Sequence, residues 1–168
     1  AKERPADSRP DAGVPTDLDQ WKLYLQRIIY PDHKLMPQHQ RWIRYTLKFA
    51  VDSLLQRCPG REERFLAPFF AYYRHPQQLE DEVAFQLLDT AAALPPAALT
   101  RPRQELLLRF AEGVCDREDV TVRAAAVLLV DRLHRLDSRS RRPLRILQKI
   151  DCRDAASLDL LRRRIIKG

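Results

Sequence analysis

The side chains that could bind a metal or catalyse a reaction are scattered along this chain of 168 residues. Its four histidines are His33, His39, His75 and His134, and none stands near Cys, Asp or Glu at a metal-binding spacing such as HExxH. His33 and His39 flank a short loop and could meet in space, but two ligands make only a weak site. The favoured interpretation is therefore that all four are surface histidines.

The cysteines, glycines and carboxylates also lack a catalytic arrangement. Cys58, Cys115 and Cys152 are odd in number and far apart, which favours a reducing compartment, nuclear or cytoplasmic, over secretion. Four widely spaced glycines cannot form a phosphate-binding loop, and no GxSxG motif occurs. Adjacent carboxylates such as Glu62 and Glu63 would point in different directions on a helix. We therefore expect no enzymatic activity, no cofactor and no small-molecule substrate.

Hydrophobic periodicity predicts helices along most of the chain, and no segment shows the alternation typical of a strand. The predicted helices cover residues 17–30, 38–57, 61–75 with a bend at Pro68, 76–94, 104–114, 120–136 and 144–150, with an eighth after Asp151 or Asp154. Seven or eight helices with short connections predict an all-α fold, either an antiparallel helical stack or an irregular bundle.

The domain organisation follows from composition. Residues 1–16 hold three prolines and almost no large apolar side chain, which predicts a disordered leader or linker. Residues 17–168 are expected to form a single helical domain. No apolar run approaches the length of a membrane span, so no membrane partner is expected.

The segment 120–136 is the most apolar of the predicted helices. Its apolar residues follow helical spacing, and Ala124, Val127 and Leu128 fill most of the remaining faces. A helix that is apolar all round is typically buried, so we expect neighbouring helices to cover it from several directions.

The run DREDVTVRAAA, from Asp116 to Ala126, resembles the turn and second helix of a HEAT repeat, with an acidic turn, then Val-Arg, then small residues. The resemblance to HEAT and armadillo-like proteins implies stacked antiparallel helix pairs that serve mainly as scaffolds for protein or nucleic-acid partners. It also implies that the turn Asp, here Asp116 or Asp119, and the helix Arg, here Arg123, bond to neighbouring repeats. Asp116 lies one residue further from Arg123 than is usual. The match covers about one repeat, and the alternative is an ordinary buried helix.

An aromatic cluster provides the first candidate for partner binding. Its members are Phe69, Phe70, Tyr72 and Tyr73. Consecutive aromatic residues cannot all share one helix face, and aromatic side chains are enriched at protein interfaces. The alternative is packing against the helices before and after, which is favoured for the phenylalanines over the tyrosines.

A basic region provides the second candidate. The chain carries a net charge of +7, and residues 132–168 hold twelve Lys/Arg against four Asp/Glu, a net +8. The candidates for contacts with nucleic acid are Arg139, Arg141, Arg142, Arg145, Lys149, Arg162, Arg163, Arg164 and Lys167, with Arg153 also in this region. Arginine suits phosphate, but no aromatic residue follows Phe110, so base stacking is disfavoured and backbone contacts remain. The alternative is a solvated basic surface.

These observations favour a non-enzymatic helical-repeat scaffold or adaptor that binds a protein partner, in a complex associated with chromosomes or nucleic acid. The alternative is a nucleic-acid-binding α-domain that uses phosphate contacts from its basic C-terminal region.

Overall fold

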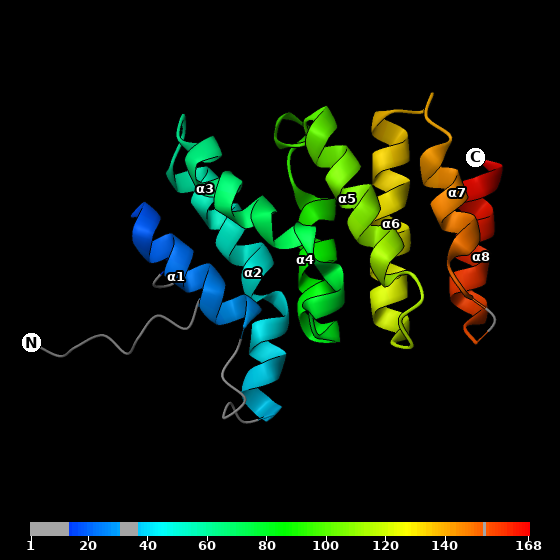
Figure 1. The fold of residues 1–168 in the computed structure, drawn as a ribbon, viewed down its shortest axis with the longest axis horizontal. Helices are drawn as coiled ribbons and strands as arrows, with labels where there is room; N and C mark the ends of the chain where they lie inside the picture. Colours follow the sequence, from blue (N-terminus) through cyan, green and yellow to red (C-terminus); the bar gives the residue numbers. More distant parts are fainter. Residues whose placement is uncertain (1–13, 31–36, 153) are drawn as a thin grey trace, which may run out of the picture. The chain divides into compact units, whose positions relative to one another are not determined.

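The computed structural model describes residues 14–30, 37–152 and 154–168, with only the main chain described within 37–46. In these ranges the regular structure is entirely helical (Figure 1). The predicted all-α helical stack is therefore confirmed. The α-helices are α1 (Leu18–Ile29), α2 (Pro37–Arg57), α3 (Glu62–Phe70), α4 (Asp81–Ala93), α5 (Arg101–Val114), α6 (Val120–Leu136), α7 (Arg142–Lys149) and α8 (Ala156–Lys167), and the 3₁₀ turns are η1 (Ala71–Arg74), η2 (Pro76–Gln78) and η3 (Pro96–Ala98).

Local sequence chemistry explains where several helices begin. The Asp17 carboxylate accepts a hydrogen bond from the N–H of Gln20 at 3.1 Å and so caps α1. The Asp119 carboxylate accepts the N–H of Thr121 at 2.8 Å and caps α6 in the same way. Helix α5 begins three residues earlier than the predicted 104, because Pro102 fits the first turn of a helix.

The region between α3 and α4 differs most from the prediction. The helix expected over 61–75 ends at Phe70, after Pro68 has interrupted its last turn. The chain then continues through η1 and η2, and α4 begins only at Asp81 rather than at residue 76. Proline at the start of η2 supports a tight turn but donates no hydrogen bond that would extend a helix.

The chain groups into two compact units, residues 1–71 and 72–168, where the sequence analysis expected one domain over 17–168. In the first unit α1 packs on α2 and α3, and the Trp21 ring N–H donates to the Phe65 carbonyl at 2.9 Å. Val14 belongs to the predicted leader 1–16, yet its side chain is buried and its carbonyl accepts from Arg57 at 3.4 Å. Residues 1–13 lie outside the described part.

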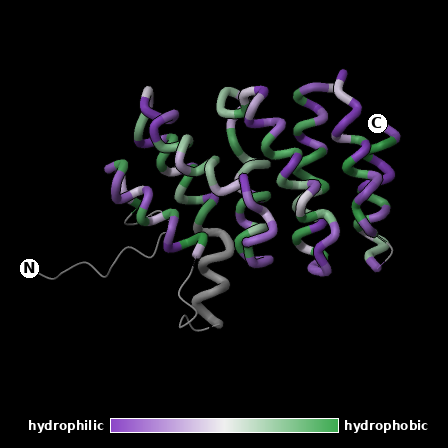
Figure 2. The backbone as a smooth tube through the Cα atoms, in the orientation of Figure 1, coloured by the Kyte–Doolittle hydropathy of each residue, from purple (hydrophilic) through white to green (hydrophobic). Residues whose placement is uncertain are grey.

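The second unit is built around α6, which packs on α4, α5, α7 and α8. The pairs α5–α6 and α7–α8 are antiparallel, while α4, α6 and α8 run in one direction with α6 between the other two (Figure 1). The sequence of α6 places apolar residues along most of its turns (Figure 2), and Leu129 and Val130 are fully buried. The four neighbours nevertheless leave part of α6 uncovered, so the expectation that it is covered on every side is only partly met.

Candidate functional site

The cysteine thiols are poor nucleophiles. All three cysteines are free and buried. Burial raises the pKa of the Cys115 thiol, and the nearby Asp116 and Glu112 carboxylates raise it further. Burial likewise raises the pKa of Cys152. A thiol with a raised pKa stays protonated near neutral pH, so neither residue is arranged as an activated nucleophile.

The described residues also offer no site for a metal ion. Within the ranges that the structure covers, no three His, Cys, Asp or Glu side chains lie close enough together to hold one. His33 and His39, which could meet across their loop, lie outside the residues whose side chains are described. In the described ranges, no helix has the length and apolar character needed to cross a membrane.

Three members of the aromatic cluster belong to the core rather than to a surface. Phe69 and Phe70, at the end of α3, are buried and meet edge to face with ring centroids 5.4 Å apart. Tyr73 is also buried, whereas Tyr72 is partly exposed. In a 3₁₀ turn residues three apart eclipse one another, so η1 turns Tyr73 to the same side as the buried Phe70. The four residues predicted as a partner surface therefore do not form one.

The burial of Tyr73 is supported by a specific hydrogen bond. Its hydroxyl donates to the carbonyl of Leu87, in α4, at 2.5 Å. Its ring meets that of Phe110, in α5, edge to face at 5.0 Å. Burial raises the pKa of this phenol well above its usual value, so the hydroxyl remains a donor at any physiological pH. Tyr73 thus holds α4 and α5 together.

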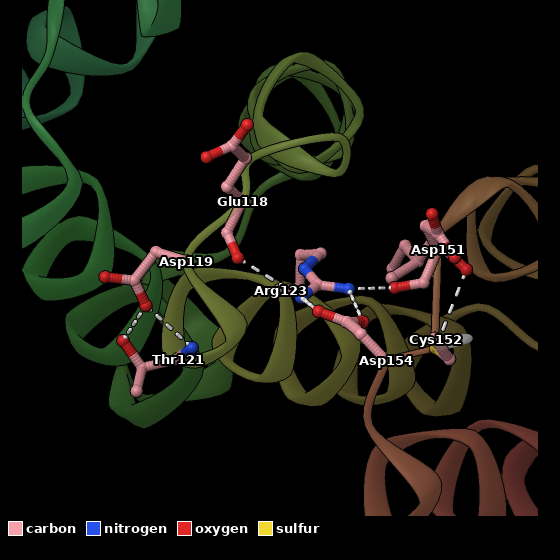
Figure 3. Close-up of polar contacts among 8 residues, drawn as sticks. Glu118, Asp119, Thr121, Arg123, Asp151, Cys152 and Asp154 are labelled. Carbon is pink, nitrogen blue, oxygen red and sulfur yellow. Dashed lines mark hydrogen bonds and ion pairs between the residues drawn. The ribbon is translucent and has the colours of Figure 1, made fainter.

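Arg123 is a buried side chain of the second unit that makes several hydrogen bonds (Figure 3). It projects from α6 and is 3 % exposed. Its two terminal nitrogens donate to the two carboxylate oxygens of Asp154 at 2.7 and 2.6 Å. They also donate to the main-chain carbonyls of Asp151 and, at 3.2 Å, Glu118. One guanidinium therefore joins the turn before α6 to the turn before α8.

The charges of this pair stabilise each other. The hydrogen bond to Arg123 holds the pKa of Asp154 below its usual value, and the bond to Asp154 raises the pKa of Arg123. The resemblance assigned inter-repeat bonds to Arg123 and to Asp116 or Asp119. Arg123 does bond to the next helix pair. Asp116 is exposed, and Asp119 accepts hydrogen bonds from Thr121 within its own helix. The acidic partner of Arg123 is Asp154, which the sequence analysis did not select for this role.

Two further arginines connect α6 and its preceding turn to α4. Arg117 donates to the Asp81 carboxylate at 2.9 Å and to the Pro76 carbonyl at 2.9 Å. Arg132 donates to main-chain carbonyls at the C-terminal end of α4, including that of Ala92 at 2.5 Å. Sequence reasoning missed these contacts because each joins residues 36 to 41 positions apart.

Because of the directions in which the helices run, many charged residues of the second unit lie at one of its two opposite ends. The contacts of Arg117 and Arg123 show that the start of α4 and the turns before α6 and α8 lie at one end, which we call the acidic end. Its acidic residues are Glu80, Asp81, Glu82, Asp116, Glu118, Asp119, Asp151 and Asp154.

The connector 137–141 between α6 and α7 lies at the opposite end, together with the last turn of α8 (Figure 1). The start of α5 belongs there too, because Arg142 forms an ion pair with Glu105. We call this the basic end.

Four of the predicted nucleic-acid contacts are already engaged by acidic side chains. Arg142 pairs with Glu105, and Lys149 pairs with Glu112 at 3.1 Å. Both partners lie in α5, so these two bonds hold α7 on α5. Arg162 and Arg163 share Asp159, at 2.7 and 3.0 Å. Arg153 is outside the described residues.

The other predicted cations are exposed and have no acidic partner within ion-pair distance in the described residues. They are Arg139, Arg141, Arg145, Arg164 and Lys167. All five lie at the basic end, in the connector, the first turn of α7 and the last turns of α8. Arg101, at the start of α5, has the same properties and was missed by the sequence analysis. Only the packing of α5 beside α7 brings it near the others.

A cleft of about 480 Å³ lies where α7 turns into α8. Its charged lining includes Lys149, Arg162 and Arg163, but also Asp151 and Asp159. Each of the three cations bonds to a carboxylate. The cleft therefore carries little excess charge for an anionic ligand.

An uncovered apolar stripe runs along α6. Val120 and Leu128 are exposed, and Ala124, between them at helical spacing, is partly exposed. Leu128 is 51 % exposed and Leu160, on the neighbouring α8, is 67 % exposed. Leu160 lies two positions after the buried Leu158, so on α8 it points away from the packed face of that helix. The stripe therefore consists of Val120, Ala124 and Leu128 on α6, and Leu160 is a separate exposed leucine.

Comparison of the chain with protein-family models, with curated proteins and with solved structures found no match.

Proposed function

We propose that this chain is a non-enzymatic helical-repeat scaffold of the HEAT type that binds a protein partner. The repeat assignment is supported by the successive antiparallel pairs α5–α6 and α7–α8 and by the guanidinium of Arg123, which bonds one pair to the next. The three free, buried cysteines suit the reducing environment of the nucleus or cytoplasm.

The observation that carries the proposal is the apolar stripe of Val120, Ala124 and Leu128 on α6, with a further exposed leucine, Leu160, on the neighbouring α8. Isolated exposed leucines are ordinary on protein surfaces, but a continuous apolar stripe marks an interaction site. Here the stripe lies on α6, which packs on α4, α5, α7 and α8 but leaves these apolar side chains uncovered. A protein partner would complete the burial that this helix lacks.

The proposal is tested by the double variant Leu128→Glu and Leu160→Glu. Both side chains are largely exposed, so the variant should keep its fold and its melting temperature. The matched control is Leu23→Glu on α1, an exposed leucine away from the stripe. Wild-type and variant proteins are immobilised and incubated with nuclease-treated cell extract, and retained proteins are quantified by mass spectrometry.

We expect specific proteins to be retained by the wild-type chain and the Leu23→Glu control and lost from the double variant. If the double variant is folded and retains the same proteins in the same amounts, the stripe is not the binding surface.

A further inference from the structure

The basic end of the second unit combines cations from four parts of the fold. They are Arg101 in α5, Arg139 and Arg141 in the connector, Arg145 in α7, and Arg164 and Lys167 in α8. All six are exposed, and none has an acidic partner among the described residues. Because they come from segments far apart in sequence, this concentration of charge is a property of the fold rather than of one basic segment.

The acidic side chains at this end do not cancel the charge. Glu105 is occupied by Arg142 and Arg109, and Asp131 is occupied by Arg135 at 2.7 Å. Asp137, at the end of α6, is the remaining carboxylate near the six cations. A strongly positive surface therefore remains, while eight of the unit's fourteen acidic residues lie at the acidic end.

We propose that the basic end binds the phosphate backbone of double-stranded nucleic acid, a function beyond the binding of a protein partner. Five of the six cations are arginines, whose planar guanidinium can donate two hydrogen bonds to one phosphate. Surfaces that prefer single strands present aromatic rings on which bases stack. No aromatic residue follows Phe110, and the ring of Phe110 is buried. The chemistry present thus suits a backbone whose bases remain paired.

The dimensions of the end match a short length of duplex. Adjacent packed helices lie about 8–10 Å apart, so cations on α5, α7, α8 and the connector spread over roughly 10–20 Å. A duplex presents one phosphate charge for about every 1.7 Å of its axis. The surface can therefore meet several phosphates at once, and we expect about three to five contacts. The six cations stand in a connector and at helix ends rather than along one helix face, so we expect contacts to the phosphate backbone and binding that is independent of sequence.

The experiment measures fluorescence anisotropy of a labelled DNA duplex of about 20 base pairs over about 50–200 mM salt. Single-stranded DNA of the same length and polyglutamate of similar charge are the comparison ligands. The first variant is Arg139→Glu, Arg141→Glu and Arg145→Glu. The second, on a different element, is Arg164→Glu and Lys167→Glu. The matched control reverses three exposed arginines of the first unit, Arg27, Arg61 and Arg64, and so changes the net charge by the same amount as the first variant. Circular dichroism verifies that each variant is folded.

For the wild-type chain we expect a dissociation constant on the order of 10⁻⁴ to 10⁻⁶ M that weakens roughly 10²-fold between about 50 and 200 mM salt. Both basic-end variants should lose most of the duplex affinity and show a shallower salt dependence, while the first-unit control should keep both. Absence of duplex binding at low salt would overturn nucleic-acid binding as such. If the control loses as much duplex affinity as the basic-end variants, the binding site lies elsewhere.

The comparison ligands decide the class of partner. Tighter binding to the single strand would contradict the preference for duplex. Polyglutamate binding with the affinity of the duplex would show that the basic end accepts any polyanion, an acidic protein segment included, and would overturn the proposal. The leucine variants of the proposed protein-binding surface should bind duplex normally, so the two proposals can fail independently.

Discussion

Replacing Arg123 with alanine should destabilise the second unit more than any other single change at a charged residue there. The side chain is 3 % exposed, and it makes two hydrogen bonds to Asp154 and one each to the carbonyls of Glu118 and Asp151. Hydrogen bonds to charged groups contribute about 1.5–3 kcal/mol each when their partners stay buried. Asp154 is 61 % exposed, so water can replace much of what the carboxylate loses.

Taking the lower part of that range, we expect Arg123→Ala to reduce the free energy of unfolding by about 2–4 kcal/mol. In a unit of about 100 residues this corresponds to a fall in melting temperature of roughly 10–20 °C. Urea unfolding should be followed by far-UV circular dichroism, because both tryptophans, Trp21 and Trp42, lie in the first unit.

Arg135→Ala is the matched control, since it removes an arginine from the same helix. Arg135 pairs with Asp131 one turn away but is 76 % exposed, so its loss should cost less than about 1 kcal/mol. Arg123→Lys should fall between the two, because an ammonium keeps the charge but cannot bond both oxygens of Asp154 as a fork does. A stability of Arg123→Ala equal to that of Arg135→Ala would refute the role assigned to Arg123. So would strict additivity of Arg123→Ala and Asp154→Ala in a double-mutant cycle.

Three further predictions concern the pH dependence of the Arg123–Asp154 pair, the buried face of α6 and the docking of Val14. The pKa of Asp154 is lowered in the folded state by Arg123, so the pair's stabilisation is present above the unfolded pKa of about 4 and lost as pH falls through the folded value. Urea midpoints measured below about pH 4 should therefore fall more steeply for the wild type than for Arg123→Ala. Leu129→Asp should abolish the cooperative thermal transition, since Leu129 is fully buried and an unpaired buried charge costs several kcal/mol; a near-native melting temperature would contradict its central place. Val14→Ala should cost about 1–1.5 kcal/mol because it removes two buried carbons, whereas no loss would show that Val14 does not dock on the first unit.

The helices could be predicted from the sequence because their signals are local. Prolines at 31, 59 and 102, the caps at Asp17 and Asp119 and the apolar stripes each act within a few residues. The same patterns could not predict the exposed stripe on α6. Periodicity shows which faces of a helix are apolar, but the coverage of those faces depends on how many neighbours the fold supplies. Val120 and Leu128 lie on an apolar face of α6 that no neighbouring helix covers.

The sequence indicated which kinds of charged residue would make contacts, but it did not show which residues they would bind. The resemblance to a HEAT repeat identified Arg123 as a residue that bonds to a neighbouring repeat, yet its partner Asp154 is 31 residues away and lies in a different turn. The basic region could be recognised from the amino-acid composition of residues 132–168. The sequence did not show which of its cations hold α7 in place and which face solvent, because Glu105 and Glu112 each lie 37 residues before the cation that they bind.

The charge separation in the second unit has a structural explanation that competes with nucleic-acid binding, and stability measurements distinguish the two. Helix α8 ends at the basic end, and cations in its last turn interact favourably with the helix dipole by about 0.3–1 kcal/mol each. Arg139 lies in the connector and Arg141 is the N-cap of α7, where the helix dipole disfavours a cation, so the dipole gives neither residue a stabilising role. If the basic end served stability alone, Arg164→Glu with Lys167→Glu would lower the melting temperature and Arg139→Glu with Arg141→Glu would change nothing. If it binds phosphates, the connector variant should leave the melting temperature unchanged and still weaken duplex binding at least tenfold at low salt, because each lost phosphate contact removes its share of counterion release.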